Sequence, residues 1–162
     1  MATDYLLEID GIKGESKDDK HPDTIEIDSF SWGNSNPGSA GHGGGGGAGK
    51  VQYQDVHFTT QVNISSPKIK MACDTGQHIK KAQLFVRKQG EEQKDYYVLT
   101  FEDFIVSSYS SGGSSGSNHL PTDQFAFNFS KMKFEYSKQK DDGGLEAPIT
   151  SGWDLQTNKK YG

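Results

Sequence analysis

The side chains that could do chemistry are spread along this 162-residue chain without the spacing that a catalytic or metal centre needs. No two histidines stand four residues apart, and a single cysteine excludes a CxxC cluster, so the sequence specifies no metal geometry. Carboxylate pairs such as Asp18 and Asp19 are adjacent rather than facing, and the serines fall mainly in loop-like segments. We expect no enzymatic activity, no metal and no cofactor. The five histidines are His21, His42, His57, His78 and His119.

Two features imitate reactive sites. Cys73 falls on the apolar face of a predicted helix without a cationic neighbour to activate it, which favours a buried structural thiol over a nucleophile. Gly44, Gly49 and Lys50 fit most of a phosphate-binding loop. Val51, however, stands where such a loop needs Ser or Thr, and a strand-like segment follows instead of a helix. Nucleotide binding is therefore not predicted.

The composition indicates a folded, acidic protein. Mean hydropathy is −0.77, yet nine Phe, seven Tyr and two Trp occur at strand-like spacing, which argues against disorder. A net charge of −5 argues against general nucleic-acid binding, because phosphate neutralisation needs a basic face. The polar N-terminus lacks the features of a signal peptide, and no apolar run is long enough to span a bilayer. We expect a cytoplasmic protein that uses no N-terminal signal if it is exported, and no membrane insertion.

Alternation of apolar and polar residues predicts a series of strands. The first lies around residues 5–10, and the second runs from about Thr24 to Trp32 with a change of phase between Ile27 and Phe30. A charged connection, residues 15–23, separates them, and His21 is expected to be solvated there. Further strands are predicted at 51–64, 77–89, 96–108 and 123–136, with a last short one at 153–155. In the strand at 77–89, Lys80, Lys81, Arg87 and Lys88 are expected in solvent.

One helix is predicted, beginning at Ser66 and Pro67 and ending at Gly76. Ser66 would accept hydrogen bonds from first-turn amides, Pro67 suits the first helical position, and Gly76 suits the left-handed cap. Glycine-rich segments at about 34–50 and 110–118 are expected to be flexible loops. Strands about ten residues apart with one short helix predict a single all-β domain over residues 1–162, a barrel or a sandwich.

The strand at 123–136 also changes phase, from Phe125, Phe127 and Phe129 to a second apolar set. That set would be left for a neighbouring subunit if one barrel cannot bury both faces. The predicted oligomer interface is therefore Met132, Phe134 and Tyr136.

Ordered segments along the whole chain resemble the haemolysin-coregulated protein (Hcp) family, the tube subunits of bacterial type VI secretion systems. These segments are 9–16 with Asp18 and His21, 29–33, 43–49, 71–73 with 76–78, 106–108, 149–154 and 158–159. The resemblance implies a β-barrel of two antiparallel sheets with one flanking helix, assembling into a hexameric ring. Rings would stack into a tube that is expelled, so the protein would be secreted from the bacterial cytoplasm. Implied partners are further copies of itself, sheath, baseplate and spike proteins, and small effectors stabilised in the ring lumen.

Two tentative surfaces follow. In the second strand, Ser29 and Ser31 face away from Phe30 and Trp32, and such short hydroxyls suit a lumen that holds cargo, although a plain solvent face has the same pattern. The family's long glycine-rich loop helps rings to stack, which implies a stacking role for Gly38, His42, Gly45, Gly49 and Lys50. The alternative is a glycan-binding β-sandwich in which Trp32 and Trp153 stack on sugars.

Overall fold

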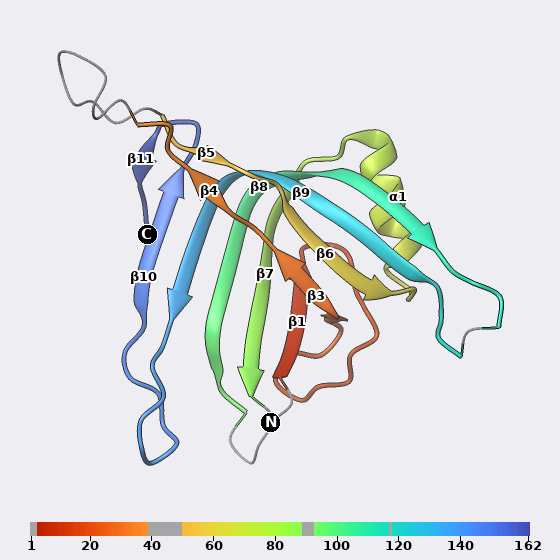
Figure 1. Ribbon diagram of the computed structural model, residues 1–162, viewed down its shortest axis with the longest axis horizontal. Coiled ribbons are helices and arrows are strands. Elements are labelled where there is room, and N and C mark those ends of the chain that lie inside the picture. The colour runs from red at the N-terminus through yellow and green to blue at the C-terminus, as the bar shows by residue number, and fades with distance from the viewer. Residues whose placement is uncertain (1–2, 39–49, 89–92, 117) are drawn as a thin grey trace.

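The computed structural model describes residues 3–38, 50–88, 93–116 and 118–162 (Figure 1). It confirms an all-β architecture with one short helix, in which every strand pairing is antiparallel. The elements are β1 (Thr3–Ile9), β2 (Ile25–Glu26), β3 (Ser29–Ser31), β4 (Asn34–Ser35), β5 (Gln52–Tyr53), β6 (Val56–Gln61), α1 (Ser66–Thr75), β7 (Ile79–Lys88), β8 (Asp95–Gly112), β9 (Thr122–Tyr136), β10 (Ile149–Asp154) and β11 (Lys159–Lys160).

β9 has two partners along one edge, and the main sheet closes on itself where residues 25–31 pass from β1 to β6. Its first half pairs with β6, from Val56 with Phe127 to Gln61 with Thr122, and its second half pairs with β10. β8 pairs along the whole opposite edge of β9, and β7, β1 and β2 follow in order. In Figure 1, β3 and β6 cross in front of the long strands. Phe58 of β6 packs edge-on against Phe101 of β8 with ring centroids 6.3 Å apart, so the core fills the space between these layers.

The predicted second strand is two strands with different partners. β2 pairs with β1, whereas β3 pairs with β6. The exchange happens within one step of the chain. The Ile27 amide donates to the Tyr5 carbonyl at 2.9 Å, and the Asp28 amide donates to the Thr59 carbonyl at 2.8 Å. The change of phase in the sequence therefore marks the place where this segment leaves one side of the barrel for the other.

The change of phase in β9 is absorbed inside the chain. Phe101 of β8 pairs with Met132, and the next inward pair is Phe104 with Phe129, three residues later in β8 and three residues earlier in β9. Asp103 lies between them with a φ of 50°, and its carbonyl accepts a hydrogen bond from the Ser130 hydroxyl at 2.8 Å. At this irregularity the inward-facing positions of both strands change from odd to even numbers or the reverse, so the apolar side chains on either side of it stay inside. Met132 is 3% exposed, and it belongs to the core and not to a surface left for a neighbour.

The helix has the predicted span but a different first turn. Ser65 is the N-cap residue, and the Ser66 hydroxyl accepts a hydrogen bond from the Asn63 amide and donates one to Asp123. Gly76 ends the helix in the left-handed conformation, with a φ of 65°, as predicted. Ile69 and Ala72 are buried in the core.

Several predicted strand boundaries are wrong, among them that of the last strand, which is expected over 153–155 but runs from Ile149 to Asp154. The strand expected over 51–64 is broken between β5 and β6, where Gln54 and Asp55 leave the ladder, and it stops at Gln61. In contrast, the strand expected to end near Ser108 continues to Gly112 because β9 pairs with it as far as Thr122. β8 therefore includes the first residues of the predicted second loop.

Candidate assembly surfaces

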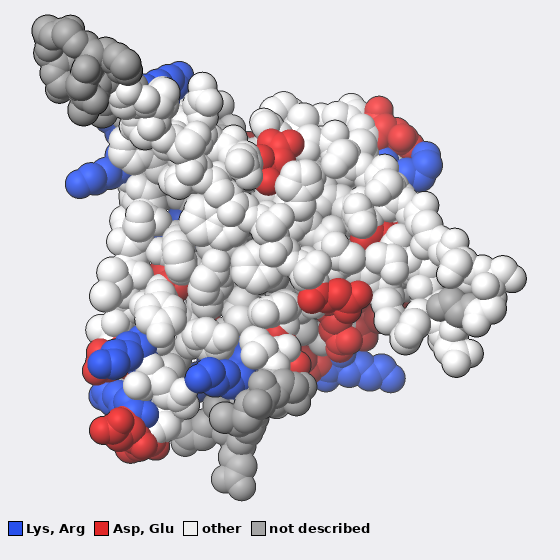
Figure 2. Space-filling model, in the orientation of Figure 1, with Lys and Arg blue, Asp and Glu red and all other residues white. Residues whose placement is uncertain are grey.

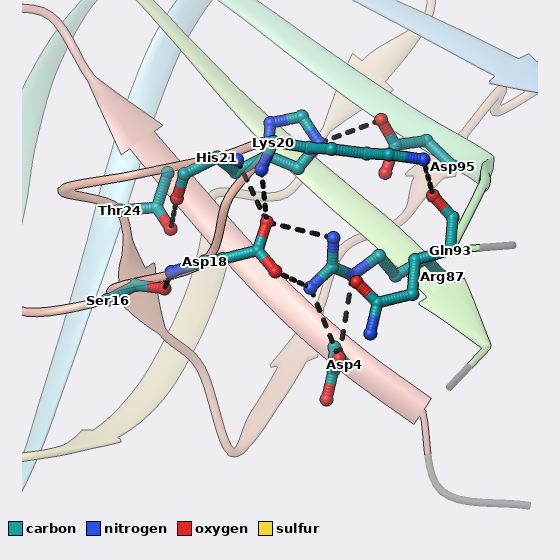
Figure 3. A network of polar contacts seen from close by, with 9 residues as sticks. All are labelled: Asp4, Ser16, Asp18, Lys20, His21, Thr24, Arg87, Gln93 and Asp95. Carbon is teal, nitrogen blue, oxygen red and sulfur yellow. Dashed lines mark hydrogen bonds and ion pairs between the residues drawn. The ribbon is translucent and has the colours of Figure 1, made fainter. Parts of the chain in front are cut away.

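A polar network holds the connection between β1 and β2 against the outer face of the sheet (Figure 3). Arg87 of β7 is 3% exposed, although the sequence placed it in solvent. Its guanidinium donates two hydrogen bonds to the Asp18 carboxylate, one of them at 2.9 Å, and its Nε lies 3.5 Å from Asp4 Oδ2. The hydrogen bonds from Arg87 lower the pKa of Asp18 to about 2. This ion pair joins residues 69 positions apart.

His21 is the second anchor of this connection and is not solvated as predicted. Its Nε2 lies 2.9 Å from Asp95 Oδ2 at the start of β8. Its ring stacks on Phe85 of β7, with centroids 4.1 Å apart, while its backbone amide donates to Asp18 Oδ2 at 2.9 Å. The sequence feature that could have indicated this contact is Phe85. It is a large aromatic residue at an outward-facing strand position, so another segment is expected to pack over it.

The tentative lumen residues Ser29 and Ser31 are both exposed on β3, while Phe30 between them is half-buried. Phe30 packs edge-on against Tyr5 with centroids 5.4 Å apart. Trp32 donates from Nε1 to the Tyr97 hydroxyl at 3.0 Å.

The two tryptophans of the glycan alternative do not form a sugar-binding platform. Trp32 and Trp153 are both half-buried. Trp32 meets Phe134 edge-on with centroids 5.7 Å apart, so its ring is engaged in the chain's own aromatic packing. The geometry gives the glycan-binding reading no support.

The predicted interface residues have three different environments. Met132 is buried, as described above. Phe134 is half-buried between Trp32 and Tyr97, the latter with ring centroids 4.7 Å away. Tyr136 is 45% exposed, so it is the member of the set with a surface to offer to a partner.

Of the tentative stacking residues, Gly38 and Lys50 are exposed, whereas His42, Gly45 and Gly49 lie outside the described residues. Gly38 follows β4 and Lys50 precedes β5, and these two strands pair through Asn34 with Tyr53. A hollow of about 980 Å³ lies between this ribbon and the end of the chain, lined among others by Asn36, Ser151 and Lys160.

Among the described residues, no group of three or more His, Cys, Asp or Glu side chains is arranged to hold a metal ion. Cys73 is half-buried and packs against the core, and His57 and His78 are exposed. Within the same ranges, no helix combines the length and apolar character required to cross a bilayer.

Comparisons with known proteins agree with one another. Residues 6–136 match the family model described as type VI secretion system effector, Hcp. A curated relative, protein hcp1 of Pseudomonas aeruginosa, is 42% identical over 160 residues, which is 98% of each chain. A solved type six secretion system protein has a TM-score of 0.93 at 30% identity and covers 99% of this chain and 100% of its own. Hcp1 from Salmonella typhimurium has a TM-score of 0.79 at 33% identity, with coverage of 99% and 100%.

The Arg87 network generates a prediction about stability. Replacement of Arg87 by Met should lower the free energy of unfolding by about 3 kcal/mol, because it leaves a carboxylate without its buried partner. Lys80→Met, which removes an exposed cation from the same strand, is the control and should change it by less than about 0.5 kcal/mol. Urea unfolding measures both.

The contribution of the Asp18–Arg87 ion pair to stability depends on pH in a defined direction. The folded-state pKa of Asp18 lies below its ordinary value of 3.8, so the ion pair stabilises the fold fully above that value, and its contribution is lost as the pH falls through about 2. In Arg87→Met, the free energy of unfolding should no longer include this decrease at acidic pH. An Arg87→Met protein as stable as Lys80→Met would mean that the network is dispensable.

Proposed function

Because this chain belongs to the Hcp family of type VI secretion proteins, we propose that it is the tube subunit of such a system. Copies close into a hexameric ring, and rings stack into the tube that the sheath expels from the bacterial cytoplasm. The protein is thereby secreted without an N-terminal signal. It works together with sheath, baseplate and spike proteins, as a structural component and not as an enzyme. The observation that carries the proposal is the near-full-length relationship to a curated Hcp protein, together with a barrel that superimposes on solved members of the system.

The proposed lumen wall is the exposed face of β3, β6 and β9. Residues directly opposite in a ladder share a face, and Ser29 pairs with Thr59, which pairs with Gln124 on β9. Ser31 pairs with His57 in the next exposed position. These side chains are polar and can donate or accept hydrogen bonds, so the face can bind varied small effectors.

The proposed stacking segment runs from Gly38 to Lys50. These two flanking residues adjoin the ribbon of β4 and β5, which lies at the same end of the molecule as β11 (Figure 1). The hollow beside this ribbon gives a neighbouring ring a concave surface to contact. Tyr53 of this ribbon packs edge-on against Phe129 with centroids 5.8 Å apart, whereas Gly38 and Lys50 are exposed.

Ser31→Gln tests the lumen assignment. The longer side chain adds no charge and points away from the core, so the ring should form as in the wild type, while co-purification of a small effector should fall. Ser114→Gln, at an exposed serine between β8 and β9, is the matched control and should bind normally. Wild-type effector recovery with the Ser31→Gln ring would remove Ser31 from the site.

Deletion of residues 39–49 tests the stacking assignment. Loop-closure free energy changes slowly with length, so the melting temperature should stay within a few degrees and rings should persist in sizing chromatography. Tube formation and secretion should be lost. If the shortened protein melts many degrees lower, the segment contributes to the fold and the assignment is wrong.

A further inference from the structure

Large apolar side chains are exposed in a pattern that the fold itself does not require. Among the described residues, five of them are exposed by 45% or more: Ile64 58%, Met71 57%, Leu120 56%, Tyr136 45% and Ile149 78%. Two of the five lie where β9 ends and β10 begins, and two lie where β6 ends and near the start of β9. Figure 1 shows these two places at opposite ends of the long axis of the molecule.

The first group forms a continuous surface, here called the tyrosine patch: Tyr136, Ile149, Tyr96 and Lys88. Ile149 is the direct ladder partner of Tyr136. The Tyr136 ring meets Tyr96 edge-on with centroids 6.4 Å apart, and Lys88 Nζ lies 5.8 Å from the centre of the Tyr96 ring. The patch therefore has an apolar centre and a cation at its border.

The second group forms the leucine patch: Ile64, Leu120, Glu15, Glu26 and Asp28. The Ile64 amide donates to Glu15 Oε1 at 3.2 Å. Leu120 and the three carboxylates line one hollow of about 320 Å³. In Figure 2 acidic side chains gather on this part of the face, between the tip of β3 and the connection that follows β8. This patch has an apolar centre and an acidic border.

A closed ring of more than two identical subunits needs a contact between two different surfaces of each chain. Stable contacts combine an apolar centre with a charged border of complementary sign. We propose, building on the proposed ring, that the tyrosine patch of one copy packs on the leucine patch of the next. Ile149, the most exposed of the five, lies against Leu120 and Ile64, and Lys88 faces the carboxylates of Glu15, Glu26 and Asp28.

Cysteine cross-linking tests this pairing directly. In a Cys73→Ser background, Ile149→Cys and Leu120→Cys are combined in one chain, and the purified ring is treated with a short bismaleimide. Because each contact joins position 149 of one copy to position 120 of the next, denaturing gels should show a ladder up to the ring size. The control combines Ile149→Cys with Met71→Cys, which is 57% exposed against 56% for Leu120 but lies outside both patches, and should give no ladder.

The outcomes separate this inference from the proposed function. An intact ring without a ladder, or an equal ladder from the Met71 control, overturns the pairing and leaves the ring standing. Dimers from Ile149→Cys alone would show a contact between like surfaces and would also overturn it. A protein that is monomeric before cross-linking contradicts the proposed ring itself. As a second measure, Ile149→Lys should raise the concentration needed to maintain the ring roughly tenfold or more, while Met71→Lys should not.

Discussion

The structure depends on the shared edge of β9. One edge of this strand pairs first with β6 and then with β10, while β8 occupies the other edge throughout. Two partners that succeed each other on one edge cannot continue one flat sheet, so the sheet must bend at the exchange. The irregularity at Asp103 and Ser130 lies at this bend. At this irregularity the inward-facing positions of β8 and β9 shift by one residue together, which keeps both Phe129 and Met132 inside one core.

This closure separates folding from assembly. Phe125, Phe127, Phe129 and Met132 are all buried within a single chain. β2 and β3 complete the wall because this segment passes from β1 to β6. What remains outside is a polar face on β3 and β6, a connection fixed by Arg87 and His21, and two exposed apolar patches. The connection between β1 and β2 is also satisfied within the chain. The His21 ring covers Phe85 on the outer face, and the buried Arg87 charge is paired with Asp18. Assembly surfaces can therefore change without disturbing the barrel.

The sequence predicted what is decided locally. Pro67 and Gly76 delimit the helix, which the structure confirms over Ser66–Thr75. The phase changes at Ile27 and Phe129 were also visible, but their cause was not. Alternation of apolar and polar residues indicates which side chains are buried, but not which strand or subunit buries them. The sequence therefore cannot distinguish burial of Met132 in the core from burial at an interface. Arg87 looked solvated for the same reason, because its partner Asp18 lies 69 positions away. Ser29 and Ser31 were placed correctly on an exposed face because Phe30, between them, has an unambiguous inward phase.

The central claim, that one chain completes its own core before it assembles, is tested by dilution. Sedimentation velocity would follow the purified protein as it is diluted from the proposed ring to single chains of 17.8 kDa, with tryptophan emission recorded at each concentration. Trp32, which directly follows β3, and Trp153 of β10 are both half-buried, so their emission reports on the barrel. The account predicts that the emission maximum is unchanged when the mass reaches that of one chain. A red shift that follows dissociation would show that a neighbouring subunit completes the core and would contradict the account.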